Sequence, residues 1–255
     1  MSTLITNISK LLHIEDKGRK YKRGHELNHF PITENAWLKI ENKKIAGFGS
    51  MDSCPDDMSN IIDAKGGMVY PGYVDSHTHL VYATTREEEF AMKLKGMTYE
   101  QIAAAGGGIL NSVKKLRQTS EDELYASAEK RLIELIKSGT TAIEIKSGYG
   151  LDLDSESKML KVAKRLAENH PIQIKKTFLG AHAVPPEFTG QRDKYVDYIV
   201  QEMLPEIATQ NLCDYVDVFC EKGYFSVDDT VKIMKSAKDL NLKSKLHVNQ
   251  FDILG

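Results

Sequence analysis

Two histidines in the sequence have the spacing of metal ligands. His77 and His79 are separated by a single threonine and follow an apolar segment, Met68–Asp75. In an extended chain, residues i and i+2 point to the same side, so both imidazoles can face one ion. A third ligand must come from elsewhere, and His247, within a second apolar segment, is the natural candidate. The alternatives are a pair of polar rim residues and a hydrogen-bonded core histidine.

A further histidine, His182, follows the apolar segment Ile172–Gly180. A histidine at the end of a strand can polarise a carbonyl or move a proton, but it can also simply hydrogen-bond to the backbone. The other four histidines lie in polar, turn-like stretches, and we expect them at the surface: His13, His25, His29 and His170.

The elements that carry these histidines alternate between two patterns. Short apolar segments typical of buried strands cover 68–75, 140–146, 172–180, 215–220 and 242–248. Helical periodicity covers 122–136, 155–169, 193–209 and 227–240. This alternation predicts an α/β fold with a parallel sheet, either doubly wound or a (β/α)8 TIM-type barrel. No glycine pattern typical of phosphate binding follows a strand, and catalytic groups of barrels gather at the strands' carboxyl ends, so we favour the barrel.

The first part of the chain has a different pattern of apolar and polar residues. Residues 1–67 are short apolar runs broken by polar turns, and Ala36–Ile40 and Ile45–Phe48 flank a turn typical of a β-hairpin. We predict a small β-rich domain over 1–67, the N-terminal part of a composite β-sandwich, followed by the barrel over 68–255. A whole barrel needs about 250 residues, so five strands predict only its N-terminal portion.

The composition excludes several classes of protein. The chain has 34 Lys and Arg against 36 Asp and Glu, and its basic residues form no cluster along the sequence. It therefore lacks the positive charge typical of nucleic-acid-binding proteins. No apolar run approaches a membrane span, and the start lacks the layout of a secretory signal. The cysteines, Cys54, Cys213 and Cys220, have no C-x-x-C spacing and indicate reduced thiols in a cytoplasmic protein.

Several segments resemble the imidazolonepropionase family of metal-dependent amidohydrolases. The segment VYPGYVDSHTHL, which contains His77 and His79, is similar to the opening barrel strand of the superfamily. More specific to the family are the segments Val81–Phe90, Ala103–Ile109, Glu144–Leu151 and Phe178–Ala183. The resemblance covers nearly the whole chain. It implies an enzyme of histidine degradation that hydrolyses the cyclic amide bond of 4-imidazolone-5-propanoate to N-formimino-L-glutamate.

The resemblance also implies a metal centre. One ion, Zn²⁺ or iron as Fe²⁺ or Fe³⁺, would be held by His77, His79 and His247. Such an ion lowers the pKa of a bound water to about 7, so that hydroxide can attack the ring carbonyl. His182 matches the catalytic histidine that polarises this carbonyl or moves a proton. The family's Asp ligand belongs to an eighth strand, which the five predicted strands do not include.

For substrate binding, the resemblance points to further residues. Arg86 matches the arginine that pairs with the propionate carboxylate, although the residues alone favour a solvated side chain beside three glutamates. Tyr149, Tyr99 and His182 match residues that contact the substrate. Gln250 stands where some members have Glu, and an amide can hydrogen-bond the ring but cannot act as a general base.

Two alternatives remain open. The first is a hydantoinase- or dihydroorotase-like enzyme with two metals bridged by a carboxylated lysine, for which Lys146 is the only candidate at a strand end. The second is a non-catalytic protein, either an inactive amidohydrolase fragment or an interaction scaffold. For the enzyme, the resemblance implies a small-molecule substrate and a homodimer.

Overall fold

A computed structural model of the chain describes residues 2–13, 18, 21–56, 60–98, 101 and 107–254. The chain divides into two units, Met1–Gly72 and Tyr73–Gly255, and each is described by itself. The division follows Gly72 rather than residue 67, because Met68–Val69 pair with the first strand of the first unit. Whether 1–67 and 68–255 are separate domains remains a prediction.

The second unit is built on a five-stranded parallel sheet with the order β10-β9-β8-β7-β6. Its strands are β6 Tyr73–Thr78, β7 Thr140–Lys146, β8 Gln173–Ala181, β9 Tyr215–Cys220 and β10 Lys243–Val248. Each strand pairs with its neighbour in sequence, which is the topology of successive β/α units of a barrel. The predicted α/β class and the five strands are therefore confirmed as a partial barrel.

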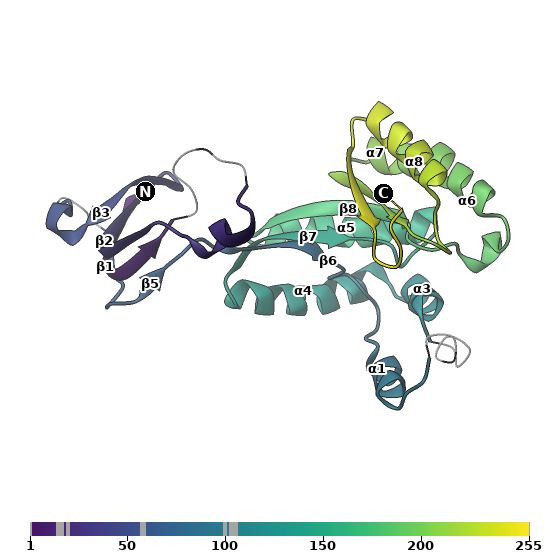
Figure 1. Ribbon diagram of the computed structural model, residues 1–255, viewed down its shortest axis with the longest axis horizontal. Helices are drawn as coiled ribbons and strands as arrows, with labels where there is room; N and C mark the ends of the chain where they lie inside the picture. The colour runs from purple at the N-terminus through teal and green to yellow at the C-terminus, as the bar shows by residue number, and fades with distance from the viewer. Residues whose placement is uncertain are drawn as a thin grey trace. The chain divides into compact units, whose positions relative to one another are not determined.

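Helices connect these strands (Figure 1). They are α1 Glu87–Leu94, α3 Ile109–Gln118, α4 Glu121–Lys137, α5 Leu153–Asn169, α6 Arg192–Tyr198, α7 Leu204–Thr209 and α8 Val227–Asp239. The helix predicted over 193–209 contains a π-helical turn, Ile199–Met203, because Pro205 has no N–H for the carbonyl four residues earlier. Within the described part of the chain, no helix has both the length and the apolar character to span a bilayer.

Helix α4 illustrates how the sequence specifies these elements. Ser120 and Glu123 form a capping box, in which the Ser120 hydroxyl accepts from the Glu123 N–H. The apolar stripe Leu124, Ala128 and Leu132 is fully buried. This stripe belongs to a core cluster shared with β7 and α5, so α4 is held along the sheet by hydrophobic packing.

The first unit contains one sheet with the order β3-β2-β1-β4, and β5 also pairs with β1. Its strands are β1 Ser2–Leu12, β2 Ile32–Glu41, β3 Lys44–Ser50, β4 Ile61–Asp63 and β5 Met68–Val69. The predicted hairpin is confirmed as β2 and β3. Asn42 and Lys43 at its turn both have positive φ, 51° and 64°, as a two-residue type I′ turn requires.

Candidate active site at the carboxyl ends of the strands

The structure brings two of the predicted metal ligands together. His77 on β6 and His247 on β10 have their Nε2 atoms 3.1 Å apart. Two imidazole nitrogens bound to one tetrahedral zinc at 2.0–2.1 Å are about 3.3 Å apart. The distance is that of a hydrogen bond between the two rings, and it is also close to the separation of two ligands of one ion. Burial and the neighbouring His247 lower the pKa of His77, which favours the neutral imidazole that a metal binds.

His79, the third predicted ligand, lies beside another histidine. Its ring stacks on that of His182, with centroids 5.3 Å apart, and lies 6.0 Å from the ring of His77. The described residues accordingly hold no group of three or more His, Cys, Asp or Glu arranged around a common metal position. The Nδ1 atom of His79 is nevertheless buried without a hydrogen-bond partner, and burial lowers the pKa of His79 to about 3. A neutral, unsatisfied imidazole fits a metal ion chemically, and its role as a ligand stays a prediction.

A buried ionic network lies on the Nδ1 side of the His247 ring. Its Nδ1 atom is 2.9 Å from the Asp217 carboxylate on β9, which also pairs with the Lys146 ammonium at 2.8 Å. Lys146 pairs in addition with Glu144 at 3.0 Å. Although burial opposes ionisation, the neighbouring His247 and Lys146 hold the pKa of Asp217 below its usual range. A carboxylate this close to Nδ1 favours the proton on that nitrogen and would leave the Nε2 lone pair for a metal ion.

The same network contains Lys146, the candidate bridge of the two-metal alternative. Lys146 is 2% exposed and its ammonium lies between the carboxylates of Glu144 and Asp217. As an ammonium it neutralises two carboxylates that would otherwise be buried without a counter-charge. In this structure Lys146 is therefore a buried counter-ion.

His182, predicted to be catalytic, lies directly after β8. Its Nδ1 atom is 2.9 Å from the Gly148 carbonyl oxygen, so Nδ1 carries the proton and Nε2 carries the lone pair. Burial lowers the pKa of His182 to about 4, although the Gly148 hydrogen bond opposes this shift. At neutral pH the ring is therefore neutral, with its lone pair on Nε2.

A cavity of about 290 Å³ opens beside His79, and its lining does not include His77, His182 or His247. It is lined by His79, Tyr82, Ala83, Thr84, Thr85, Arg86, Ser112 and Tyr149. The Arg86 guanidinium lies 5.7 Å from the centre of the Tyr149 ring, and its Nε donates to the Ser112 hydroxyl at 3.2 Å. Burial raises the pKa of Tyr149, so its phenol keeps its proton at neutral pH. The cavity is thus lined by a cation, Arg86, a hydrogen-bond donor, Tyr149, and a histidine at the end of a strand, His79.

The two other predicted substrate contacts are Tyr99 and Gln250. Tyr99 lies outside the described residues. Gln250 is exposed, and its backbone N–H donates to the carboxylate of Glu221, which also accepts from the Phe251 N–H at 3.3 Å. The cavity lining does not include Gln250, so its contact with a substrate stays a prediction.

Sequence reasoning missed Glu144 and Asp217. Both lie inside apolar strands, in the segments TTAIEIK and YVDVFC, and are at most 3% exposed. An acidic residue in such a strand is rarely buried unless it is paired. This was the signal that could have identified them as partners of a nearby Lys or His.

Solved structures share the fold of this chain at low sequence identity. A triazine hydrolase from Arthrobacter aurescens aligns with 98% of this chain and 53% of its own, with a TM-score of 0.66 and 18% identity. Guanine deaminase from E. coli aligns with 97% of this chain and 53% of its own, with a TM-score of 0.62 and 12% identity. Atrazine chlorohydrolase from A. aurescens, a further match at TM-score 0.59 and 17% identity, was solved in complex with zinc. These matches show that the chain shares the fold of these hydrolases and this deaminase.

Closer relatives are found by sequence, although no family model matches the chain. Imidazolonepropionases from Christiangramia forsetii and Flavobacterium johnsoniae are 50% and 52% identical to it over 256 residues. These alignments cover 100% of this chain and 62% of each relative. The imidazolonepropionase of Clostridium tetani is 43% identical, over 100% of this chain and 61% of its own length. The chain thus spans about three fifths of these curated relatives, and over its whole length it belongs with the imidazolonepropionase family.

Proposed function

We propose that this site hydrolyses the cyclic amide bond of 4-imidazolone-5-propanoate to give N-formimino-L-glutamate, a step of histidine degradation. The observation that carries the proposal is the cavity that joins Arg86 and Tyr149 to His79. A small ring with a propionate tail needs a cation for the tail and polar groups at the ring. The names of the relatives support the same reaction.

Arg86 is the group that binds the carboxylate tail. Its Nε donates to Ser112 on α3, which orients the plane of the guanidinium. The two terminal nitrogens can then form a bidentate pair with a carboxylate, and Glu89 is only a distant competitor at 4.0 Å. The arrangement favours substrates that combine a small ring with an anionic tail.

His77, His79 and His247 are the proposed ligands of one Zn²⁺ or iron ion. Such an ion, when bound, supplies an activated water and polarises the carbonyl under attack. Asp217 keeps the proton of His247 on Nδ1 and so directs Nε2 toward His77. The unsatisfied Nδ1 atom of His79 is the observation that supports its inclusion.

His182 is the proposed proton carrier. With Nδ1–H donated to Gly148, its Nε2 can accept a proton from the attacking water and pass it to the leaving ring nitrogen. Gln250 cannot do this, because an amide does not accept a proton at neutral pH. Tyr149, which keeps its own proton, donates a hydrogen bond to the substrate.

The proposal extends to the whole protein. In this proposal the whole protein is an eight-stranded TIM-type barrel with a composite β-sandwich, to which residues 1–67 contribute, and it works as a cytoplasmic homodimer. The sheet described in the first unit, with Ile8, Leu11, Ala36 and Leu38 buried, would supply one layer of that sandwich.

Turnover by the purified chain tests the proposal. We expect loss of the ultraviolet absorbance of 4-imidazolone-5-propanoate, no turnover of hydantoin or dihydroorotate, and loss of activity in His247→Ala. Turnover of hydantoin or dihydroorotate would instead support the two-metal enzyme. A soluble chain that binds metal but turns over none of the three compounds would support the non-catalytic alternative.

A further inference from the structure

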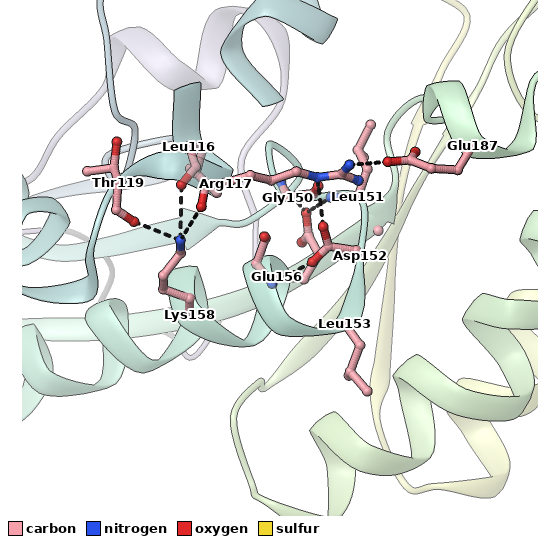
Figure 2. Close-up of polar contacts among 12 residues, drawn as sticks. Leu116, Arg117, Thr119, Gly150, Leu151, Asp152, Leu153, Glu156, Lys158 and Glu187 are labelled. Carbon is pink, nitrogen blue, oxygen red and sulfur yellow. Dashed lines mark hydrogen bonds and ion pairs between the residues drawn. The ribbon is translucent and has the colours of Figure 1, made fainter. Parts of the chain in front are cut away.

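Glu156, on the first turns of α5, is a fully buried carboxylate that the reaction above does not use. It accepts hydrogen bonds from three backbone N–H groups of the preceding loop, Gly148 at 3.0 Å, Gly150 at 2.8 Å and Leu151 at 2.9 Å. Figure 2 shows its carboxylate beside Gly150 and Leu151. Burial raises the pKa of Glu156, whereas these donors favour its ionised form. The loop thus wraps around an internal anion.

The loop that Glu156 holds has an unusual backbone. Gly148 has φ +109°, and a side chain there would meet the His182 Nδ1 atom at 2.8 Å. Leu151 has φ 58° although it is not glycine, and it is 1% exposed. Such conformations persist only where the surroundings determine them, and they concentrate at functional sites. The converging N–H groups on Glu156 supply that constraint.

The same loop carries the parts of the candidate site that lie outside the metal centre. The Gly148 carbonyl accepts from His182 Nδ1 at 2.9 Å and so sets the tautomer of that ring. Tyr149 follows, with its ring 5.6 Å from the ring of His182. Glu156 holds the N–H groups on both sides of Tyr149, those of Gly148 and Gly150. A displacement of the loop would therefore move both side chains together.

Arg117 on α3 anchors the loop at a second point (Figure 2). Its Nε donates to the Gly150 carbonyl at 3.0 Å and also lies 2.7 Å from the carboxylate of Asp152, and its NH1 pairs with Glu187. Helix α3 also carries Ser112, which bonds to Arg86. The loop, α3 and the carboxylate-binding arginine are thus linked by specific polar contacts.

We propose that Glu156 and Arg117 are positioning residues that hold the loop 147–151 so that Tyr149 faces the cavity and His182 keeps its proton on Nδ1. The inference rests on the proposed function only in taking Tyr149 and His182 as substrate contacts. The hydrogen bonds that carry it belong to the protein alone, so it can be tested without metal and without turnover.

The test compares Glu156→Gln with Ser157→Ala as the matched control. Gln has nearly the shape of Glu but sets an NH₂ group against one of the loop's donors. Ser157 is the next residue, is buried, and its hydroxyl has no hydrogen-bond partner. Two readouts are used: the imidazole ¹⁵N signals of His182, which report its tautomer, and the Kd of imidazole-4-propanoate, a stable ring with a propionate tail.

We expect Glu156→Gln to lose the Nδ1–H tautomer of His182 and to raise the Kd about tenfold or more, since small misplacements of binding groups cost that much. Ser157→Ala should match the unmodified chain in both readouts. A folded Glu156→Gln variant with an unchanged His182 tautomer and Kd would overturn the inference.

Arg117→Met provides the second variant, because it loosens the same loop without altering a buried carboxylate. If Glu156→Gln does not fold, unchanged His182 signals in Arg117→Met would overturn the inference, and a shifted tautomer would support it. An unmodified chain that does not bind imidazole-4-propanoate would contradict the proposed function instead, because the His182 signals report on the loop without any ligand.

Discussion

His77 and His247 lie on the two outermost strands of the five-stranded sheet, yet their Nε2 atoms are only 3.1 Å apart. In a flat sheet, four strand spacings of about 4.8 Å would separate β6 from β10 by roughly 19 Å. The sheet must therefore curl strongly, so that side chains at the carboxyl ends of its edge strands meet. This is the geometry by which a barrel assembles a site from residues far apart in sequence.

The contact between Asp217 and His247 predicts a dependence of metal affinity on a residue that is not a ligand. Asp217→Asn should weaken zinc binding about 10- to 100-fold, because Asn no longer fixes the His247 tautomer. Titration against a competing chelator measures this effect. Asp214→Asn is the matched control, because Asp214 binds the Lys176 backbone N–H and should leave zinc affinity unchanged. Equal affinity in Asp217→Asn and the unmodified chain would contradict the assignment.

Substitution of Arg86 by Lys should act on substrate binding more than on the chemical step. Lysine keeps the charge but loses the bidentate geometry, so KM for 4-imidazolone-5-propanoate should rise about tenfold or more while kcat changes little. Steady-state kinetics separate the two constants. Arg165→Lys, at an exposed ion pair with Asp122, is the control. A fall in kcat at constant KM would show that Arg86 does not bind the tail.

Lys158 should contribute to stability through the end of α3. Its ammonium donates to the carbonyl of Leu116 at 3.0 Å, which also accepts from the Thr119 N–H, and to the carbonyl of Thr119 at 2.7 Å (Figure 2). Lys158→Met keeps the aliphatic chain and should lower the free energy of unfolding by about 1–3 kcal/mol. Urea denaturation measures this loss. Lys161, like Lys158, lies on α5, and its side chain is exposed. Lys161→Met should therefore have little effect, and equal losses of stability in both variants would contradict the capping role.

The three free thiols should differ in reactivity. Cys213 and Cys220 are buried, and burial raises the pKa of Cys213 to about 12, so almost none of it is thiolate near neutral pH. Cys54 is half-buried, so a reagent can reach its thiol. Burial also raises its pKa, so the reaction should be slow. An aromatic disulfide reagent should modify one thiol of the native chain and all three after unfolding. Reaction of Cys213 in the native chain would contradict its burial.

Sequence patterns predicted the second unit well, because hydrophobic periodicity and capping residues are local. The strand at 140–146 and the helix that starts after Ser120 are examples. Helix α1 was not predicted, because three successive glutamates after Arg86 favoured a solvated stretch. The metal-ligand candidates were recognised from the H-x-H spacing and the family resemblance.

The polar network of the site could not be predicted from the sequence. Glu156 binds backbone N–H groups, and only the positive φ of Gly148 and Leu151 makes them converge. Asp217 and Lys146 meet across 71 residues of sequence, and no local pattern specifies such a pair. Their pairing follows from the order of the strands in the curled sheet.

The most direct test of the central claim, that the strand-end histidines form one mononuclear metal centre, is the metal content of the purified chain by mass spectrometry. We predict one zinc or iron ion per chain, lost in His77→Ala and in His247→Ala. His170→Ala, at a histidine that is half-buried rather than at the surface as predicted and that pairs with Glu129, should retain it. Two ions per chain, or one ion retained in both His77→Ala and His247→Ala, would contradict the claim.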